Sequence, residues 1–253
     1  MINNYIKRFF FRFIFFFLFL LPILSSSTTF KIKKDIKRKP IIVLDAGHGG
    51  KNTGAKKQYP LCEEKRLSLI TTLLAKRYIE QMGYRVILTR SKDAFISLAK
   101  RVYIANKFNA DLFVSIHFNS SYNRKAKGIE VYYPRKIKSN KRSSLSHRLA
   151  SNILLKSIFH TKAVSRGVKE ANFYVIKDTK MPAILLEGGF ITNDVECRRL
   201  RQRQYLEKLA KGIAEGVGIY LKRSSSARFE RTTCCLGGNR SIQLSYEDKN
   251  KAA

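Results

Sequence analysis

The sequence predicts an α/β domain in which a sheet lies between helices. Short apolar runs alternate along the chain with segments that have helical periodicity, which is the pattern of such folds. The first run begins at Ile41 and is continuously apolar, as is typical of a buried parallel strand. With 253 residues, the chain is long enough for one such domain and too short for two of ordinary size.

The first half of the domain is predicted as three strands separated by two helices. The strand from Ile41 leads into the Gly-rich turn G-H-G-G, where glycine allows a sharp change of direction. Residues 64–82 follow as a helix, because apolar side chains recur there at helical spacing, and Gly83 ends it. The next elements are a strand at 84–88, a helix at 97–107 with an apolar inner face, and a strand at 111–116.

The second half continues the alternation. A strand is predicted at 128–133, followed by a polar and basic loop at 134–143 and an amphipathic helix at 145–159. Two short apolar runs, 173–176 and 183–186, are predicted as strands, and a helix at 206–221 closes the domain. The predicted domain therefore spans residues 41–222.

The segments outside the domain have their own composition. Residues 1–27 place three basic residues ahead of the apolar run from Phe13 to Leu24 and three serines after it, which is the layout of a signal peptide. This run is shorter than the roughly 20 residues of a membrane-spanning helix, and an uncleaved amino-terminal anchor is the alternative. Residues 28–40 form a basic linker, and residues 223–253 are expected to be a disordered polar tail.

The net charge is +32, from 50 lysines and arginines against 18 acids. Such a charge attracts polyanions, so nucleic acid, anionic lipid and anionic cell-wall polymer are the candidate partners. Almost all of this positive charge lies after the expected export segment, so nucleic acid is disfavoured as a partner. An exported protein of the periplasm or cell envelope is expected. The cysteines, Cys62, Cys197, Cys234 and Cys235, have no C-x-x-C spacing, which argues against a thiolate zinc site.

Two histidines occupy matching places at the ends of predicted strands. His48 follows the first strand, and His117 ends the strand at 111–116 within S-I-H-F-N. Ligands of open α/β sheets gather at the carboxyl ends of strands, and two imidazoles with one carboxylate suit a catalytic zinc ion. Glu64 begins the helix after the His48 turn and offers that carboxylate. Glu63 is its rival, since an acid at a helix start is often only a favourable dipole partner.

A further acid, Glu187, directly follows the apolar strand 183–186 and precedes two glycines. Because burying an unpaired charge is costly, this residue needs either a partner or a function. A helix cap or an ion pair with an arginine is the structural alternative. The functional alternative is that Glu187 acts as a general base, which takes a proton from zinc-activated water and passes it to a leaving nitrogen.

At these residues the sequence resembles the zinc-dependent N-acetylmuramoyl-L-alanine amidases of bacterial sporulation and cell division. Four motifs match in order over about residues 40–221: D-A-G-H-G-G-K-N-T-G-A, E-K-x-x-x-L, A-D-L-F-V-S-I-H-F-N and P-A-I-L-L-E-G-G-F-I-T-N. The resemblance implies one zinc ion held by His48, Glu64 and His117, with Glu187 as the catalytic glutamate, and the E-K pair favours Glu64 over Glu63.

The resemblance also implies a fold and a substrate. It implies a mixed, mostly parallel sheet of about six strands flanked by helices on both faces. The expected substrate is peptidoglycan, cut at the amide between N-acetylmuramic acid and L-alanine of the stem peptide. Some members have an inhibitory helical insertion that an activator removes. Only about ten residues stand at that place here, so no dedicated activator is expected.

Two alternative functions remain open from the sequence. Ser97-Leu98-Ala99-Lys100 has the S-x-x-K spacing of penicillin-binding serine enzymes, although no K-T-G follows it, and Ser97 also suits a helix cap. The other alternative is a wall-binding domain without activity, against which the complete set of predicted site residues argues.

Overall fold

The computed structural model describes residues 38–135 and 141–234, and all structural statements concern these residues. The expected export segment 1–27, residues 28–37 of the expected linker and residues 235–253 lie outside the described residues, as do residues 136–140. Within the described part of the chain, no helix combines the length and apolar character needed to cross a membrane.

The centre of the domain is a mixed sheet of six strands in the order β4-β1-β5-β8-β6-β7. The strands are β1 (Ile41–Ala46), β4 (Arg85–Leu88), β5 (Leu112–Asn119), β6 (Ile129–Pro134), β7 (Ser165–Ala171) and β8 (Ala183–Phe190). Neighbouring strands are parallel except for β6 and β8, which pair antiparallel. A separate hairpin joins β2 (Lys56–Lys57) to β3 (Cys62–Glu63). The predicted fold class is confirmed.

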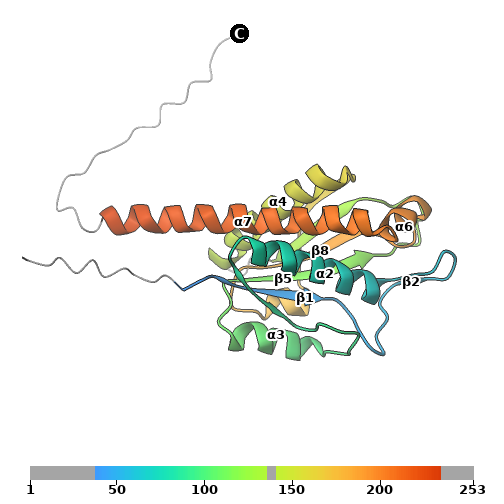
Figure 1. Cartoon of the computed structure of the whole chain (residues 1–253), viewed down its shortest axis with the longest axis horizontal. Helices are drawn as coiled ribbons and strands as arrows, with labels where there is room; N and C mark the ends of the chain where they lie inside the picture. The colour runs from blue at the N-terminus through green and yellow to red at the C-terminus, as the bar shows by residue number, and fades with distance from the viewer. Residues whose placement is uncertain (1–37, 136–140, 235–253) are drawn as a thin grey trace, which may run out of the picture. The chain divides into compact units, whose positions relative to one another are not determined.

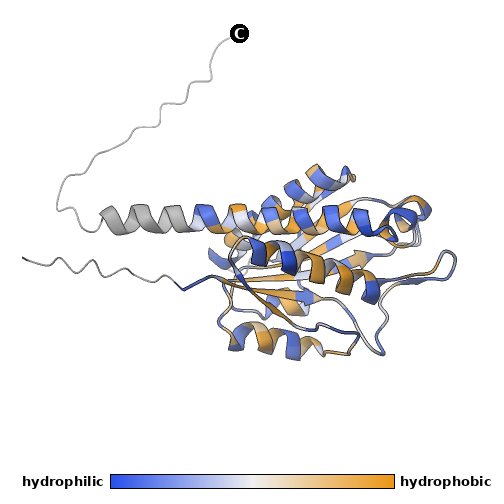
Figure 2. Cartoon of the chain, viewed as in Figure 1, coloured by the Kyte–Doolittle hydropathy of each residue, from blue (hydrophilic) through white to orange (hydrophobic). Residues whose placement is uncertain are grey.

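Helices cover both faces of the sheet (Figure 1). One face packs against α2 (Glu64–Gln81), α4 (Lys141–Thr161) and α7 (Arg203–Cys234), and the other against α3 (Leu98–Lys107) and α5 (Tyr174–Lys177). A short helix, α6 (Asp194–Leu200), follows β8. In Figure 2 the strand β1 is almost wholly hydrophobic, whereas the helices carry both hydrophobic and hydrophilic residues. This mixture is expected of a helix that buries one face and exposes the other.

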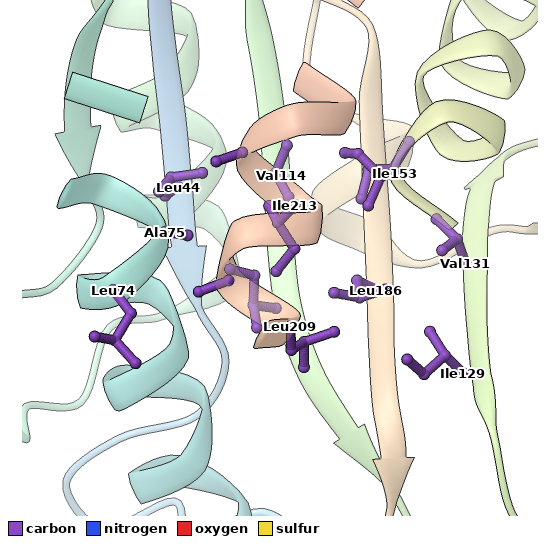
Figure 3. Close-up of a cluster of buried hydrophobic side chains, with 14 of the residues drawn as sticks. Leu44, Leu74, Ala75, Val114, Ile129, Val131, Ile153, Leu186, Leu209 and Ile213 are labelled. Carbon is purple, nitrogen blue, oxygen red and sulfur yellow. The ribbon is translucent and has the colours of Figure 1, made fainter. Parts of the chain in front are cut away.

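The larger core lies between the sheet and the three helices α2, α4 and α7 (Figure 3). Leu44, Val114 and Leu186 extend from three adjacent strands towards these helices, and Ile153 and Ile213 meet them from α4 and α7. All five side chains are fully buried, and each contributes about 1.5 to 3 kcal/mol of hydrophobic free energy to folding. This core holds the strands in the register that places the site.

Side chains alternate across a strand, so the remaining positions of the same strands face α3 and α5. Val43, Phe113 and Leu185 form a smaller core on that face. Further along the same strands, this alternation carries His117 and Glu187 to the face of α3 and α5, at the carboxyl edge of the sheet. The two residues are register partners on β5 and β8.

The predictions for residues 173–176 and for the carboxyl tail were wrong in part. The segment at 173–176 is not a strand but largely the helix α5, whose Val175 and Ile176 are buried against the sheet. The neighbouring strand is β7, which the sequence did not reveal because an edge strand needs no apolar run. Residues 223–234 were expected to be disordered, yet they continue α7, because extending a packed helix is easier than starting one.

Two other segments also differ from the expectation. The helix α6 was not predicted, because its seven residues are too short for a clear helical period. The helix α4 begins at Lys141 rather than at residue 145, within the expected basic loop. Neither difference changes the architecture around the site.

Candidate metal and catalytic site

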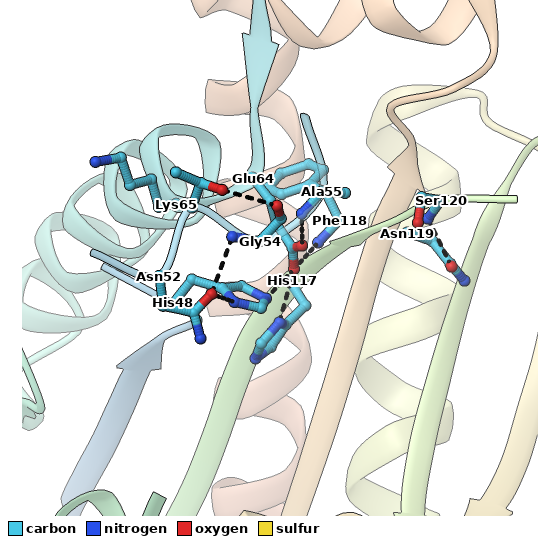
Figure 4. Close-up of polar contacts among 12 residues, drawn as sticks. His48, Asn52, Gly54, Ala55, Glu64, Lys65, His117, Phe118, Asn119 and Ser120 are labelled. Carbon is cyan, nitrogen blue, oxygen red and sulfur yellow. Dashed lines mark hydrogen bonds and ion pairs between the residues drawn. The ribbon is translucent and has the colours of Figure 1, made fainter. Parts of the chain in front are cut away.

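Three elements bring His48, Glu64 and His117 together at one edge of the sheet (Figure 4). His48 lies in the turn after β1, Glu64 is the first residue of α2, and His117 lies near the end of β5. The turn passes so close to the second imidazole that a Cβ at Gly47 would lie 2.3 Å from the His117 ring. Only glycine leaves room for this approach.

The three side chains present their donor atoms to a common point. Glu64 Oε1 lies 2.9 Å from His48 Nε2 and 2.8 Å from His117 Nδ1. One ligand atom from each residue lies within 4.8 Å of the others. Two imidazole nitrogens and one carboxylate oxygen are a donor set typical of catalytic zinc, which leaves a fourth position for water or substrate. The donor set therefore fits a zinc ion.

The rival carboxylate, Glu63, is directed elsewhere. Its Oε1 lies 3.2 Å from Lys56 Nζ on the β2–β3 hairpin. Glu64, by contrast, has a side chain that is only 7% exposed, and its Oε2 accepts a hydrogen bond of 2.8 Å from the Ala55 amide. The structure thus brings Glu64, and not Glu63, to the two histidines.

The charge of Glu64 suits ligation. Burial by itself raises the pKa of Glu64, but the hydrogen bonds and charges of His117 and His48 outweigh it and lower the pKa to about 2. Burial lowers the pKa of His48, while the hydrogen bond and charge of Glu64 raise it above its ordinary value. Glu64 is therefore ionised at neutral pH, as a metal ligand must be.

Asn52 orients His48, although the sequence did not single it out. Its Oδ1 lies 2.9 Å from His48 Nδ1 and also accepts a hydrogen bond of 3.1 Å from the Gly54 amide. Since this oxygen only accepts hydrogen bonds, it holds the proton on Nδ1 and leaves Nε2, which faces Glu64, free to bind a metal.

A buried ion pair between Arg101 and Asp45 fixes the turn that carries His48. Arg101 Nη1 lies 2.6 Å from Asp45 Oδ1, and Arg101 Nη2 donates to the His48 carbonyl at 2.7 Å. His48 has a φ of 58°, which is unfavourable for a residue with a Cβ, so it needs such fixation. Burial raises the pKa of Asp45, but Arg101 and hydrogen bonds from Thr89 and Ser115 outweigh it, so the pKa is lowered.

Asp45 could have been found from the sequence. It interrupts an apolar strand just as Glu187 does, and the same rule about buried charges applies to it.

Glu187 extends into the same pocket as the three predicted ligands. The pocket has a volume of about 480 Å³ and is lined by His48, Glu64, His117 and Glu187, with apolar residues of α3, α5 and the segments before them on its walls. Burial raises the pKa of Glu187 well above its ordinary value, and the charges of Glu64 and Glu130 add to this. Its Oε2 is buried without a hydrogen-bond partner among the described residues, and no ion pair with an arginine forms there.

Glu130 lies opposite Glu187 on β6 and is a second acid that the sequence did not single out. Its carboxylate is held by four donors at 2.6 to 2.8 Å, namely Asn119, Tyr132, Arg166 and Lys169. Burial raises its pKa, but the hydrogen bonds from Lys169 and Arg166 outweigh burial and lower it. Of the two neighbouring acids, Glu130 is therefore satisfied and ionised, whereas Glu187 remains available for proton transfer.

The S-x-x-K alternative has a structural explanation. Ser97 caps α3, with its Oγ accepting a hydrogen bond of 3.2 Å from the Lys100 amide. The Lys100 ammonium lies 4.6 Å from the centre of the Tyr103 ring. The pair therefore serves the helix start, and a serine peptidase is not supported.

Comparisons with known proteins agree with this geometry. The family model described as N-acetylmuramoyl-L-alanine amidase matches residues 42–218. The amidase CwlM of Bacillus licheniformis is 32% identical over 74% of this chain and 70% of its own length, and AmiA of Escherichia coli is 34% identical over 72% and 76%.

A solved structure has the same fold. The catalytic domain of the amidase CwlV from Bacillus (Paenibacillus) polymyxa superposes with a TM-score of 0.67 at 36% identity, covering 72% of this chain and 98% of that one. The chain therefore belongs to the N-acetylmuramoyl-L-alanine amidase family.

Proposed function

We propose that this protein uses one zinc ion and Glu187 to hydrolyse the amide between N-acetylmuramic acid and L-alanine in peptidoglycan. Amidase activity on peptidoglycan follows from the family and from the relatives named above. The observation that supports the zinc mechanism is the convergence of His48, Glu64 and His117, with Glu187 in the same pocket.

The residues divide the reaction between them. His48, Glu64 and His117 would hold zinc, which when bound supplies a Lewis acid that acidifies water and polarises a carbonyl. Glu187 takes a proton from the attacking water through its carboxylate and delivers it to the alanine nitrogen as the carbon–nitrogen bond breaks. A raised pKa suits this role, because a group with that pKa both accepts a proton and holds it until the nitrogen leaves.

The walls of the pocket would hold the substrate beside these groups. Phe95 and Leu98 stand on one side and Phe173 and Tyr174 on the other, and each is between 42% and 56% exposed. Exposed apolar side chains around a polar floor are typical of binding pockets, in which a few polar groups set the orientation of the ligand.

Mass spectrometry of digested muropeptides tests this function. The wild type should yield glycan with a free lactyl carboxylate and stem peptide with a free alanine amine. A chelator should abolish both products, added zinc should restore them, and Glu187→Ala should yield neither. Cleavage at a glycosidic bond or at a peptide cross-link would contradict the proposed bond, and activity that resists the chelator would contradict the metal.

We further propose that the protein acts in the periplasm or cell envelope, in wall remodelling or cell division, after export through residues 1–27 with or without cleavage. The basic composition supports attraction to an anionic wall polymer or membrane surface, and nucleic acid is not a proposed partner. The attraction should weaken as salt rises, since exposed charges are screened within about 10 Å at 0.1 M. Binding to purified walls that does not change between low and high salt would contradict it.

We also propose that no dedicated activator is needed. The connection between β6 and α4, where the inhibitory insertion of some family members is expected, runs only from Pro134 to Lys141. The purified full chain should therefore digest peptidoglycan unaided. A many-fold rise in rate on adding an activator from the same cell would contradict this proposal.

A further inference from the structure

A row of charged side chains crosses the sheet beside the pocket. His117 on β5 pairs with Glu187 on β8, and Glu187 pairs with Glu130 on β6. Residues paired in this way place their side chains on one face of the sheet. Arg166 and Lys169 on β7 extend the row, because Arg166 Nε and Lys169 Nζ lie 2.8 and 2.6 Å from Glu130 Oε2. The row therefore runs from a predicted metal ligand, past the predicted base, to two cations on an edge strand.

Glu130 does not balance the full charge of the two cations. Two positive charges against one negative charge leave these three groups with a net charge of +1. The Glu130 side chain is 3% exposed, whereas the side chains of Arg166 and Lys169 are 36% and 40% exposed. The surplus positive charge is therefore open to solvent, from which an anionic ligand can reach it.

Arg166 is held in a way that suits the binding of a carboxylate. The centre of its guanidinium lies 4.9 Å from the centre of the Phe190 ring, and its Nε donates to Glu130. Among the described residues, no group accepts a hydrogen bond from its Nη1 or Nη2 atom. These two nitrogens form the fork with which arginine binds a carboxylate through two parallel hydrogen bonds. Arg166 therefore keeps a bidentate edge for an anion.

Aromatic side chains connect the pocket to the two cations. Phe173 lines the pocket and packs edge-on against the Tyr132 ring, with 5.1 Å between the ring centres. The Tyr132 hydroxyl donates to Glu130 at 2.8 Å, and Lys169 Nζ lies 5.9 Å from the centre of the Tyr132 ring. A peptide that leaves the pocket past Phe173 and Tyr132 would therefore meet Lys169 and Arg166.

The separation from Glu187 suits the second residue of a leaving peptide. Neighbouring strands lie about 4.8 Å apart, so Glu130 and its two cations are roughly 5 to 10 Å from Glu187 across the sheet. An extended peptide rises about 3.3 to 3.6 Å per residue, so about two residues cover that distance. In the proposed function, on which this inference rests, Glu187 protonates the alanine nitrogen, so the peptide extends from Glu187 on the side away from His117.

We propose that Arg166 and Lys169 form a subsite for a carboxylate on the second residue of the stem peptide, the residue that follows the alanine. Arg166 Nη1 and Nη2 bind the two carboxylate oxygens, and Lys169 contributes a further charge-assisted hydrogen bond. Glu130 positions both cations and does not itself touch the substrate. The subsite makes the hydrolase specific for stem peptides in which this group is a free acid rather than an amide.

Two synthetic muramoyl tripeptides test the subsite. They differ only at the second residue, which carries a free carboxylate in one and a carboxamide in the other, and both are amidated at the carboxyl end. The zinc-loaded full chain should hydrolyse the free acid with a kcat/KM roughly 10 to 100-fold higher, because charge-assisted hydrogen bonds are lost with the amide. Equal kcat/KM values for the two tripeptides would overturn the proposal.

Substitutions separate recognition from a structural role of the ion pairs. Arg166→Gln should reduce the preference to less than about threefold, and Arg166→Lys, which keeps the charge without the fork, should give an intermediate value. Arg148→Gln is the matched control, since Arg148 stacks on Tyr220 from α4, as Arg166 does on Phe190, and it should keep the full preference. The ratio does not depend on how much of a variant is folded. An Arg166→Gln variant that keeps the wild-type ratio would overturn the proposal.

Binding without reaction distinguishes failure of the subsite from failure of the proposed function. Calorimetric titration of the zinc-loaded Glu187→Gln variant with each tripeptide should show the free acid binding roughly 10 to 100-fold more tightly than the amide. Lys169→Gln in the same background should reduce this difference. If the wild type hydrolyses neither tripeptide while the difference in affinity persists, the proposed function fails and the subsite stands. Equal or undetectable binding of the two tripeptides would overturn the subsite whatever the rates of hydrolysis.

Discussion

His117 and Glu187 are register partners on the adjacent parallel strands β5 and β8. Residues paired in this way place their side chains on the same face of a sheet. The pairing therefore sets a predicted metal ligand beside a predicted general base without any contribution from loops.

Glu187→Gln should lower the rate of muropeptide hydrolysis by roughly 10² to 10⁴-fold, because an amide of the same shape cannot accept the proton of water. Zinc content measured by atomic emission should stay at one ion per chain. Glu207→Gln is the matched control, since Glu207 pairs with Arg203 on the surface, and its rate should equal that of the wild type. Full activity in the Glu187→Gln variant would exclude Glu187 as the base.

Asp45→Asn should destabilise the protein by roughly 3 to 5 kcal/mol, because it leaves the buried Arg101 guanidinium without its carboxylate. The lowered pKa of Asp45 means that its contribution is complete above the unfolded value of about 4 and is lost as pH falls through the folded value. Urea unfolding in chelator, at neutral pH and in steps down to pH 3, measures both effects.

The exposed Asp178 supplies the control for this experiment. Asp178→Asn should unfold within about 0.5 kcal/mol of the wild type at neutral pH. If Asp45→Asn shows the same loss of stability with acid as the wild type, another group accounts for that loss.

Asn52→Ala should weaken zinc binding by roughly 10 to 100-fold, because His48 loses the acceptor that fixes its ring. Asn52→Asp should restore binding, since a carboxylate oxygen accepts the same hydrogen bond. Competition with a zinc-binding dye measures the affinity, and Asn123→Ala, in an exposed loop, is the control. Equal affinities for Asn52→Ala and the wild type would contradict the orienting role.

Zinc at 100 times its dissociation constant should raise the free energy of unfolding of the wild type by about 2.7 kcal/mol, because the ion binds only the folded state. His48→Ala should lose most of this gain. His147→Ala should keep it, since that exposed histidine packs against Tyr133 and not against the site. Chemical unfolding with and without zinc distinguishes these results, and an equal response from all three proteins would place the metal elsewhere.

The sequence was sufficient for five of the six strands of the sheet and for most of the candidate site. Continuous apolar runs located β1, β5 and β8, and the position of His48 and His117 after such runs indicated that they would meet. The failures share a cause. The edge strand β7 and the helix α5 depend on what lies next to them, and neither has a local pattern strong enough to reveal this.

The sequence by itself determined the fold class, the family and the residues whose chemistry suits zinc, because strand patterns and ligand types are local properties of the chain. Only the tertiary structure decided which groups surround them. The acceptor for His48 and the four donors around Glu130 join residues that are far apart in the sequence or that meet only through the fold. Such contacts depend on strand register and helix packing, in which the whole core takes part, and no single segment encodes them.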